Sequence, residues 1–162
     1  MRATPMIAAL LVSIASGASA GPRDRAETEM ARDGHSAIIA GRQAAFKLTL
    51  ASFVGLKAAI TRGDDPKTLV LPASAIAAWG KAIPSMFPAH SDGPASKALP
   101  TIWSDGTAFE ARATDMAAAA DKLAALAKAG NAAALPAQWD SLKGSCAACH
   151  IKYRAEDVKN RQ

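Results

Sequence analysis

The feature that most constrains the fold of this chain is a helical repeat of apolar residues. In the segment from about Glu27 to Arg62, large apolar side chains recur every seven residues, at Ile39, Phe46, Phe53 and Ile60. This spacing places them on one face of a long α-helix. Two residues that lie between them on the same face, Arg42 and Thr49, are polar although the face should be buried.

A second segment repeats the pattern after the turn sequence RGDDP. Its apolar residues are Ile76, Trp79, Ile83 and Phe87. Pro84 should end or kink this helix, because proline lacks the amide hydrogen and clashes with the preceding turn. The next stretch, Phe87 to Pro100, is rich in proline, glycine and serine, which predicts a long loop.

Two more helical segments complete the chain. The third should start near Ser104 or Asp105, which are favoured N-caps, and should stop at Gly130. The fourth should start near Pro136. Its apolar stripe consists of Leu135, Trp139, Leu142, Cys146, Cys149 and Tyr153. Four amphipathic helices with two short connections and one longer one predict an all-α fold, an antiparallel four-helix bundle.

The first twenty residues have the pattern of a secretory signal peptide. A positive start is followed by the apolar run MIAALLVSIA and by Ala18-Ser19-Ala20, which fits an A-x-A cleavage site. The apolar run is too short to span a bilayer comfortably. We therefore expect cleavage after Ala20, export, no stable membrane insertion, and one domain over residues 21–162.

The charge balance excludes some function classes. The chain has 19 Lys and Arg against 14 Asp and Glu, a formal net charge of +5. No dense basic cluster with interleaved aromatic residues accompanies this mild excess, so nucleic-acid binding is not expected. No set of residues for nucleophilic, acid–base or phosphate chemistry emerges either, so the chain is not expected to be an enzyme.

The two cysteines stand three residues apart in the sequence CAACH, with His150 directly after Cys149. A disulfide fits poorly, because side chains three apart on a helix are about 5–6 Å from each other, whereas bridged Cβ atoms need about 3.8 Å. A thioredoxin-like dithiol would need a βαβ context, and a zinc site would need further ligands. A helical thiol protein without haem is the remaining alternative.

C-x-x-C-H is the attachment pattern of c-type haem. Each thiol adds to one vinyl group of the macrocycle, and the histidine then lies under the iron as its axial ligand. The sequence therefore predicts one covalently attached haem c, with Cys146 and Cys149 as thioether ligands and His150 as the iron ligand.

With this motif near its C-terminus, the chain resembles the cytochrome c′ family. The resemblance covers about Glu27 to Lys159, and its specific pieces are GRQAAFK, the loop MFPAHSDGPASKALPTIWSD and SCAACHIKYR. It implies a four-helix bundle in the periplasm and a homodimer as one possibility. Ile151 stands where family members often carry an acidic residue.

The resemblance also implies roles for single residues. Arg42 and Gln43 match a pair beside the haem, and a haem propionate would give the Arg42 cation a partner. Phe46 matches the distal position, where five-coordinate members carry a bulky apolar residue and low-spin relatives carry a methionine ligand. Arg154 matches a basic residue one turn after the axial histidine.

These matches imply an exported haem protein that transfers electrons to or from redox partner proteins in the periplasm, or binds small gases such as NO or CO at a five-coordinate iron. The alternative is a six-coordinate, low-spin electron carrier of the same fold, with a methionine from elsewhere in the chain as the sixth ligand.

Overall fold

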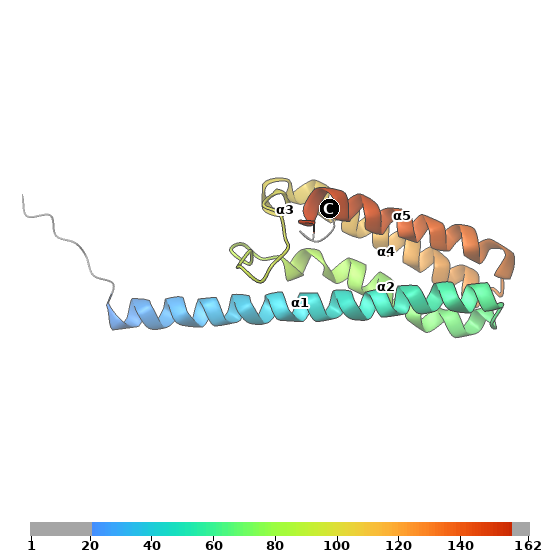
Figure 1. Ribbon diagram of the computed structural model, residues 1–162, viewed down its shortest axis with the longest axis horizontal. Helices are drawn as coiled ribbons and strands as arrows, with labels where there is room; N and C mark the ends of the chain where they lie inside the picture. Colours follow the sequence, from blue (N-terminus) through green and yellow to red (C-terminus); the bar gives the residue numbers. More distant parts are fainter. Residues whose placement is uncertain (1–20, 157–162) are drawn as a thin grey trace, which may run out of the picture.

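The computed structural model describes residues 21–156, so the expected signal peptide lies outside the described residues. Four long helices form the bundle (Figure 1): α1 (Pro22–Arg62), α2 (Val70–Ala82), α4 (Gly106–Lys128) and α5 (Leu135–Tyr153). Four short helical turns connect them: η1 (Pro66–Leu69), η2 (Pro84–Met86), α3 (Thr101–Ser104) and η3 (Ala132–Ala134). Neighbouring long helices run in opposite directions, which confirms the predicted antiparallel four-helix bundle.

The helix ends follow local rules that can be read from the sequence. Gly63 ends α1 in the left-handed region with φ 75°, and its amide donates to the carbonyls of Ala59 and Ile60. Glycine is favoured there because it has no Cβ to oppose a positive φ. As predicted, α2 stops before Pro84, where the chain tightens into η2.

Two boundaries differ from the sequence prediction. The first helix starts at Pro22, not near Glu27, because proline is well tolerated in a first helical turn. The turn α3 was not predicted. Asp105 precedes α4 as expected, but its side chain does not cap that helix; it accepts a hydrogen bond from Lys152 at the end of α5 instead.

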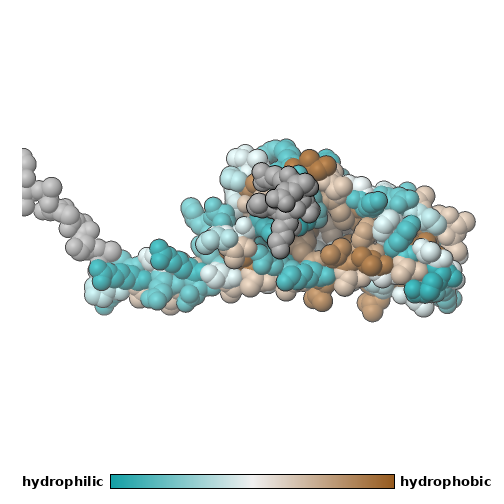
Figure 2. All heavy atoms as spheres, in the orientation of Figure 1, coloured by the Kyte–Doolittle hydropathy of each residue, from teal (hydrophilic) through white to brown (hydrophobic). Residues whose placement is uncertain are grey.

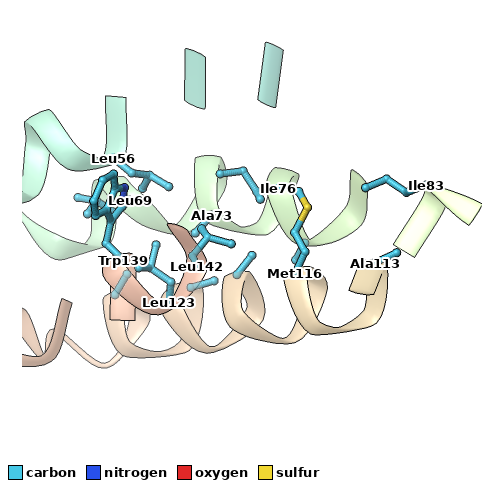
Figure 3. Packing of buried hydrophobic residues seen from close by; sticks show 14 of the residues in the cluster. Leu56, Leu69, Ala73, Ile76, Ile83, Ala113, Met116, Leu123, Trp139 and Leu142 are labelled. Carbon is cyan, nitrogen blue, oxygen red and sulfur yellow. The ribbon is translucent and has the colours of Figure 1, made fainter. Parts of the chain in front are cut away.

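The core lies between α2, α4 and the first half of α5, with α1 closing one side (Figure 3). Its largest fully buried apolar side chains are Leu56, Leu69, Ile76, Leu123 and Leu142. Small residues let α2 and α4 approach closely. A Cβ added at Gly80 would lie 3.0 Å from the Cα, Cβ and backbone nitrogen of Ala117.

The helix α1 extends well beyond the other three (Figure 1). Its residues 22–34 are all exposed, and its first buried residue is Ile39. By length and composition alone, α1 contains an 18-residue stretch apolar enough to cross a membrane, and 6% of that stretch is buried. The buried core helices of soluble proteins and signal sequences pass the same test.

Candidate functional site

The thiols and the imidazole of the C-x-x-C-H motif lie on the last three turns of α5. Cys146 and Cys149 are free and half-buried, and Cys149 packs against the core. His150 reaches solvent. Within residues 21–156 no three His, Cys, Asp or Glu side chains lie close enough together to hold a metal ion by themselves, and the three side chains of the motif are no exception.

One contact fixes how α5 aligns with α1. The Trp139 ring stacks on the Phe53 ring at a centroid distance of 4.5 Å, and its indole nitrogen donates to the Phe53 carbonyl oxygen. The helices are antiparallel and rise about 1.5 Å per residue. Cys146 lies seven residues after Trp139 on α5, and Phe46 lies seven residues before Phe53 on α1. The two residues are therefore level with each other along the bundle axis. Eleven residues from the same contact on each helix, His150 comes level with Arg42.

The motif also lies on the side of α5 that faces α1. Positions 139, 146 and 150 lie within a narrow sector of α5, so Cys146 and His150 share the side on which Trp139 meets α1. On α1, Phe46, Leu50 and Phe53 form the corresponding strip. In Figure 1 the ribbons of the two helices are close where α5 begins and α1 ends, and they diverge towards the end of α5 that carries the motif.

This strip of α1 is apolar, and part of it is open. Leu50 is 60% exposed and its neighbour Val54 is 57% exposed. Phe46 is partly buried, and its ring meets the edge of Trp79 from α2 at a centroid distance of 5.2 Å. Leu50 was not predicted as part of the site, although its spacing of four from Phe46 and three from Phe53 could have indicated it.

Arg42 is buried, with 2% of its surface exposed, and it holds the loop at residues 87–100. Its guanidinium donates to the side chain and the carbonyl oxygen of Ser91, at 2.8 and 2.5 Å, and to the Ser96 hydroxyl at 2.7 Å. It also donates to the Met86 carbonyl oxygen and covers the Phe87 ring at 4.2 Å. Neutral groups of the protein therefore accept the hydrogen bonds of this cation, and its pairing with a haem propionate stays a prediction.

The same loop is attached to the end of α5. The Leu99 amide donates to the Tyr153 carbonyl oxygen, and the Ala155 amide donates to the Lys97 carbonyl oxygen. Arg154 directly follows α5 and forms an isolated β-bridge with Ala98. The loop is also attached to α1, because the Gln43 side chain donates to the Ala95 carbonyl oxygen at 2.7 Å.

The loop thereby brings together residues that are far apart in the sequence. Arg42 and Gln43 of α1 form hydrogen bonds with one part of it, and the residues that follow the motif form hydrogen bonds with another part. The sequence could not reveal Ser91 and Ser96 as partners of Arg42, because the loop has no periodicity that places its side chains.

The protonation states suit attachment of a c-type haem. Burial raises the pKa of the Cys146 thiol, and burial together with the nearby Cys146 sulfur raises the pKa of Cys149. Both therefore remain thiols at neutral pH, the form that adds across a vinyl group. Although His150 reaches solvent, desolvation by the surrounding protein, and next the charge of Arg154, lower its pKa. Its imidazole is neutral at pH 7, with a lone pair available for a metal.

Comparison with known proteins agrees with this donor set. The model of the family described as Cytochrome C' matches residues 37–154. The chain is 34% identical over 117 residues to the cytochrome c′ of Rubrivivax gelatinosus, covering 70% of this chain and 90% of the relative. It is also 34% identical over 104 residues to cytochrome c-556 of Agrobacterium tumefaciens, covering 62% of this chain and 84% of the relative.

Solved structures give the same result. The cytochrome c′ of Rhodopseudomonas palustris superposes with a TM-score of 0.66 at 32% identity, covering 75% of this chain and 98% of that structure. The cytochrome c′ of Thermochromatium tepidum superposes with a TM-score of 0.69 at 25% identity, covering 75% of this chain and 97% of that one. With fold, motif and sequence in agreement, this chain belongs to the cytochrome c′ family and, like that family, carries a covalently attached c-type haem.

Proposed function

We propose that Cys146 and Cys149 hold this haem through two thioether bonds, that His150 is its axial iron ligand, and that the protein works by electron transfer or by binding a small gas. One observation carries the proposal: the helix register brings the motif of α5 level with the apolar strip of α1 around Phe46. A planar apolar cofactor needs such an apolar surface opposite its point of attachment.

The bound haem would supply an iron that cycles between ferrous and ferric states and a sixth coordination position for NO or CO. The residues of this chain set how that position is used. Phe46 has no lone pair, so beside a bound haem it would occlude this position without ligating the iron. Arg42 and Gln43 order the loop beside it, and Arg154 lies on the side of His150.

The methionines of the described residues do not favour a six-coordinate site. Met30 lies on the projecting part of α1 and is 70% exposed. Met116 is a core residue of α4 with 7% of its surface exposed. Met86, in η2, approaches Gly41 with its terminal methyl group. None of the three lies on the strip of α1 that faces the motif, which supports a five-coordinate iron.

Compartment and assembly follow from the same proposal. An exported chain, cleaved after Ala20 and loaded with haem in the periplasm, fits both the signal-like segment and the family. A homodimer is supported by the exposed apolar residues Leu48 and Leu71, which are 71% and 79% exposed. A cytochrome c′ of known structure is described as having ligand-controlled dimer dissociation. The protein would exchange electrons with redox partner proteins, and we do not propose that it turns over a substrate.

Covalent attachment tests this function directly. Protein produced with haem-export machinery should give a haem-staining band on a denaturing gel and the pyridine haemochrome spectrum of a haem with two thioether bonds. Replacing Cys146 and Cys149 together with alanine should abolish the band. A double variant that keeps covalent haem contradicts the assignment.

The optical spectrum tests the coordination state. We expect a largely high-spin ferric spectrum and a ferrous form that binds CO or NO. A wild-type protein that is fully low-spin, with a methionine-to-iron charge-transfer band, would show that the six-coordinate alternative holds.

A further inference from the structure

The open edge of the site is lined by lysines that have no acidic partner. Lys57 of α1 lies over the Trp139 ring at 4.5 Å, and Lys143 of α5 lies over the same ring at 6.0 Å. Lys47 follows Phe46 on α1 and is exposed. Among the residues that the structure describes, no carboxylate forms an ion pair with any of these three lysines, which we call the lysine rim.

The sequence around the α1 part of the rim holds no carboxylate, whereas on α5 Asp140 precedes Lys143 by three residues without forming an ion pair with it. Residues 34–63, which include most of α1, contain Arg42, Lys47, Lys57 and Arg62 but neither aspartate nor glutamate. On α4, by contrast, Asp121 pairs with Lys81 of α2 and Arg112 pairs with Asp115. The part of α1 between Gly34 and Gly63 therefore carries cations without a carboxylate among them.

Apolar side chains lie inside the rim. Leu50 and Val54 stand between Lys47 and Lys57 on the helix surface, and both are more than half exposed. Figure 2 shows apolar atoms on the edge of α1 that faces α5, with polar atoms beside them. An apolar centre within a ring of like charges is typical of a transient protein interface steered by electrostatics.

We propose that this α1–α5 face is where electrons enter and leave, and that it docks an electron-transfer protein through a carboxylate-rich patch. The inference rests on the proposed function, because the face is useful for this only if the haem is attached at the motif between the two helices. Charge complementarity favours an acidic protein, since the rim offers three cations that no internal carboxylate satisfies.

Electron transfer with small charged reagents measures the charge at this face. In the reaction, ferrous iron gives one electron to hexacyanoferrate(III) and becomes ferric, while the reagent becomes hexacyanoferrate(II). We expect the rate to fall about tenfold as ionic strength rises from low to physiological salt, since screening removes steering. With the cationic oxidant tris(phenanthroline)cobalt(III), the rate should rise with salt.

A matched pair of triple variants locates that charge. Replacing Lys47, Lys57 and Lys143 with glutamine should slow the low-salt reaction with hexacyanoferrate(III) several-fold and flatten its salt dependence. The control replaces Lys67, Lys122 and Lys128 with glutamine, so it removes the same charge from other exposed positions. An equal effect of both variants overturns the proposal, because only net charge would then matter.

Cross-linking gives a readout that does not depend on redox activity. Carbodiimide couples a carboxylate of poly-L-glutamate to a lysine amine that touches it, forming an amide while the carbodiimide becomes its urea. Peptide mapping should place the cross-links at the three rim lysines in preference to Lys67, Lys122 and Lys128. Cross-links spread evenly over both sets contradict the proposal.

Two further measurements separate other outcomes. Binding of the holoprotein to phosphatidylglycerol vesicles through the rim, without the preference for poly-L-glutamate, would assign the face to a lipid surface instead. A rim variant with a strongly shifted midpoint potential would show that these lysines pair with the cofactor, which also overturns the proposal. The haem-staining gel is run first, so failure of haem attachment is distinguished from failure of this inference.

Discussion

At the scale of single residues, the chain shows how far a sequence pattern can identify a site. Cys146, Cys149 and His150 are recognisable because covalent chemistry requires their spacing. Arg42 is conspicuous because a cation on an apolar stripe would be buried and must find partners for its hydrogen bonds. What satisfies it could not be read from the sequence, because the acceptors at Ser91 and Ser96 come from an aperiodic loop that only the fold brings to α1.

Replacing Arg42 with methionine should destabilise the protein by about 3 kcal/mol, because buried hydrogen bonds to a charged group each contribute about 1.5–3 kcal/mol and their acceptors would be left unsatisfied. Urea unfolding of the holoprotein measures the loss. The exposed neighbour Lys47, replaced with methionine, is the control and should change the free energy of unfolding by less than about 0.5 kcal/mol. A small loss for both variants would mean that Arg42 does not hold the loop.

The distal position gives a second prediction at this scale. Phe46→Met offers a thioether level with the motif, so it should shift the ferric spectrum towards the low-spin, six-coordinate form. Phe46→Ala should open the position and speed CO binding to the ferrous iron. Stopped-flow and optical spectra measure both. If neither variant changes spin state or CO binding, Phe46 is an ordinary core residue packed on Trp79.

At the scale of elements, the apolar period predicted all four long helices, since a stripe that must be buried leaves little freedom. The irregular details were less accessible. The turn α3 has only four residues and no period to detect. Asp105 was expected to cap α4 through its side chain, but the competing cation Lys152 comes from the far end of the chain, which local sequence cannot reveal.

The crossing of α2 and α4 gives the prediction for this scale. Gly80→Ala raises helix propensity by about 1 kcal/mol but forces a methyl group against the Ala117 backbone, and overpacking of this kind costs about 1–3 kcal/mol. We expect a net loss of stability of about 1 kcal/mol in thermal or urea unfolding.

Gly55 is the matched control for this prediction. It lies inside α1 with no atom within 4 Å of an added Cβ. Gly55→Ala should therefore stabilise the protein by up to about 1 kcal/mol, since only the propensity gain applies. Equal stabilisation by both substitutions would show that α2 and α4 move apart at little cost.

At the scale of the whole molecule, the bundle divides into a packed end and an open end. Trp139 and Phe53 join α1 to α5 in the packed half, while towards the motif the two helices diverge and the loop spans between them. The four-helix architecture was predictable from the sequence because it follows from apolar stripes. The early start of α1 was not, because residues 22–34 carry no apolar stripe and extend outside the family match at residues 37–154.

This projecting part of α1 leads to the last prediction. Since residues 22–34 are exposed, removing them should change the free energy of unfolding by less than about 0.5 kcal/mol. The denaturant m-value should also stay constant, because it reports surface newly exposed on unfolding, and this segment is exposed already. Because these residues are helical, the deletion should lower the helical circular dichroism by the share of helix that they contribute. Deleting residues 22–42 is the contrasting variant, because it also takes away the buried Ile39 and Arg42, and it should lose several kcal/mol. If the shorter deletion is as damaging as the longer one, the projecting turns of α1 pack against protein in solution, and their exposure in the single chain does not describe the working molecule.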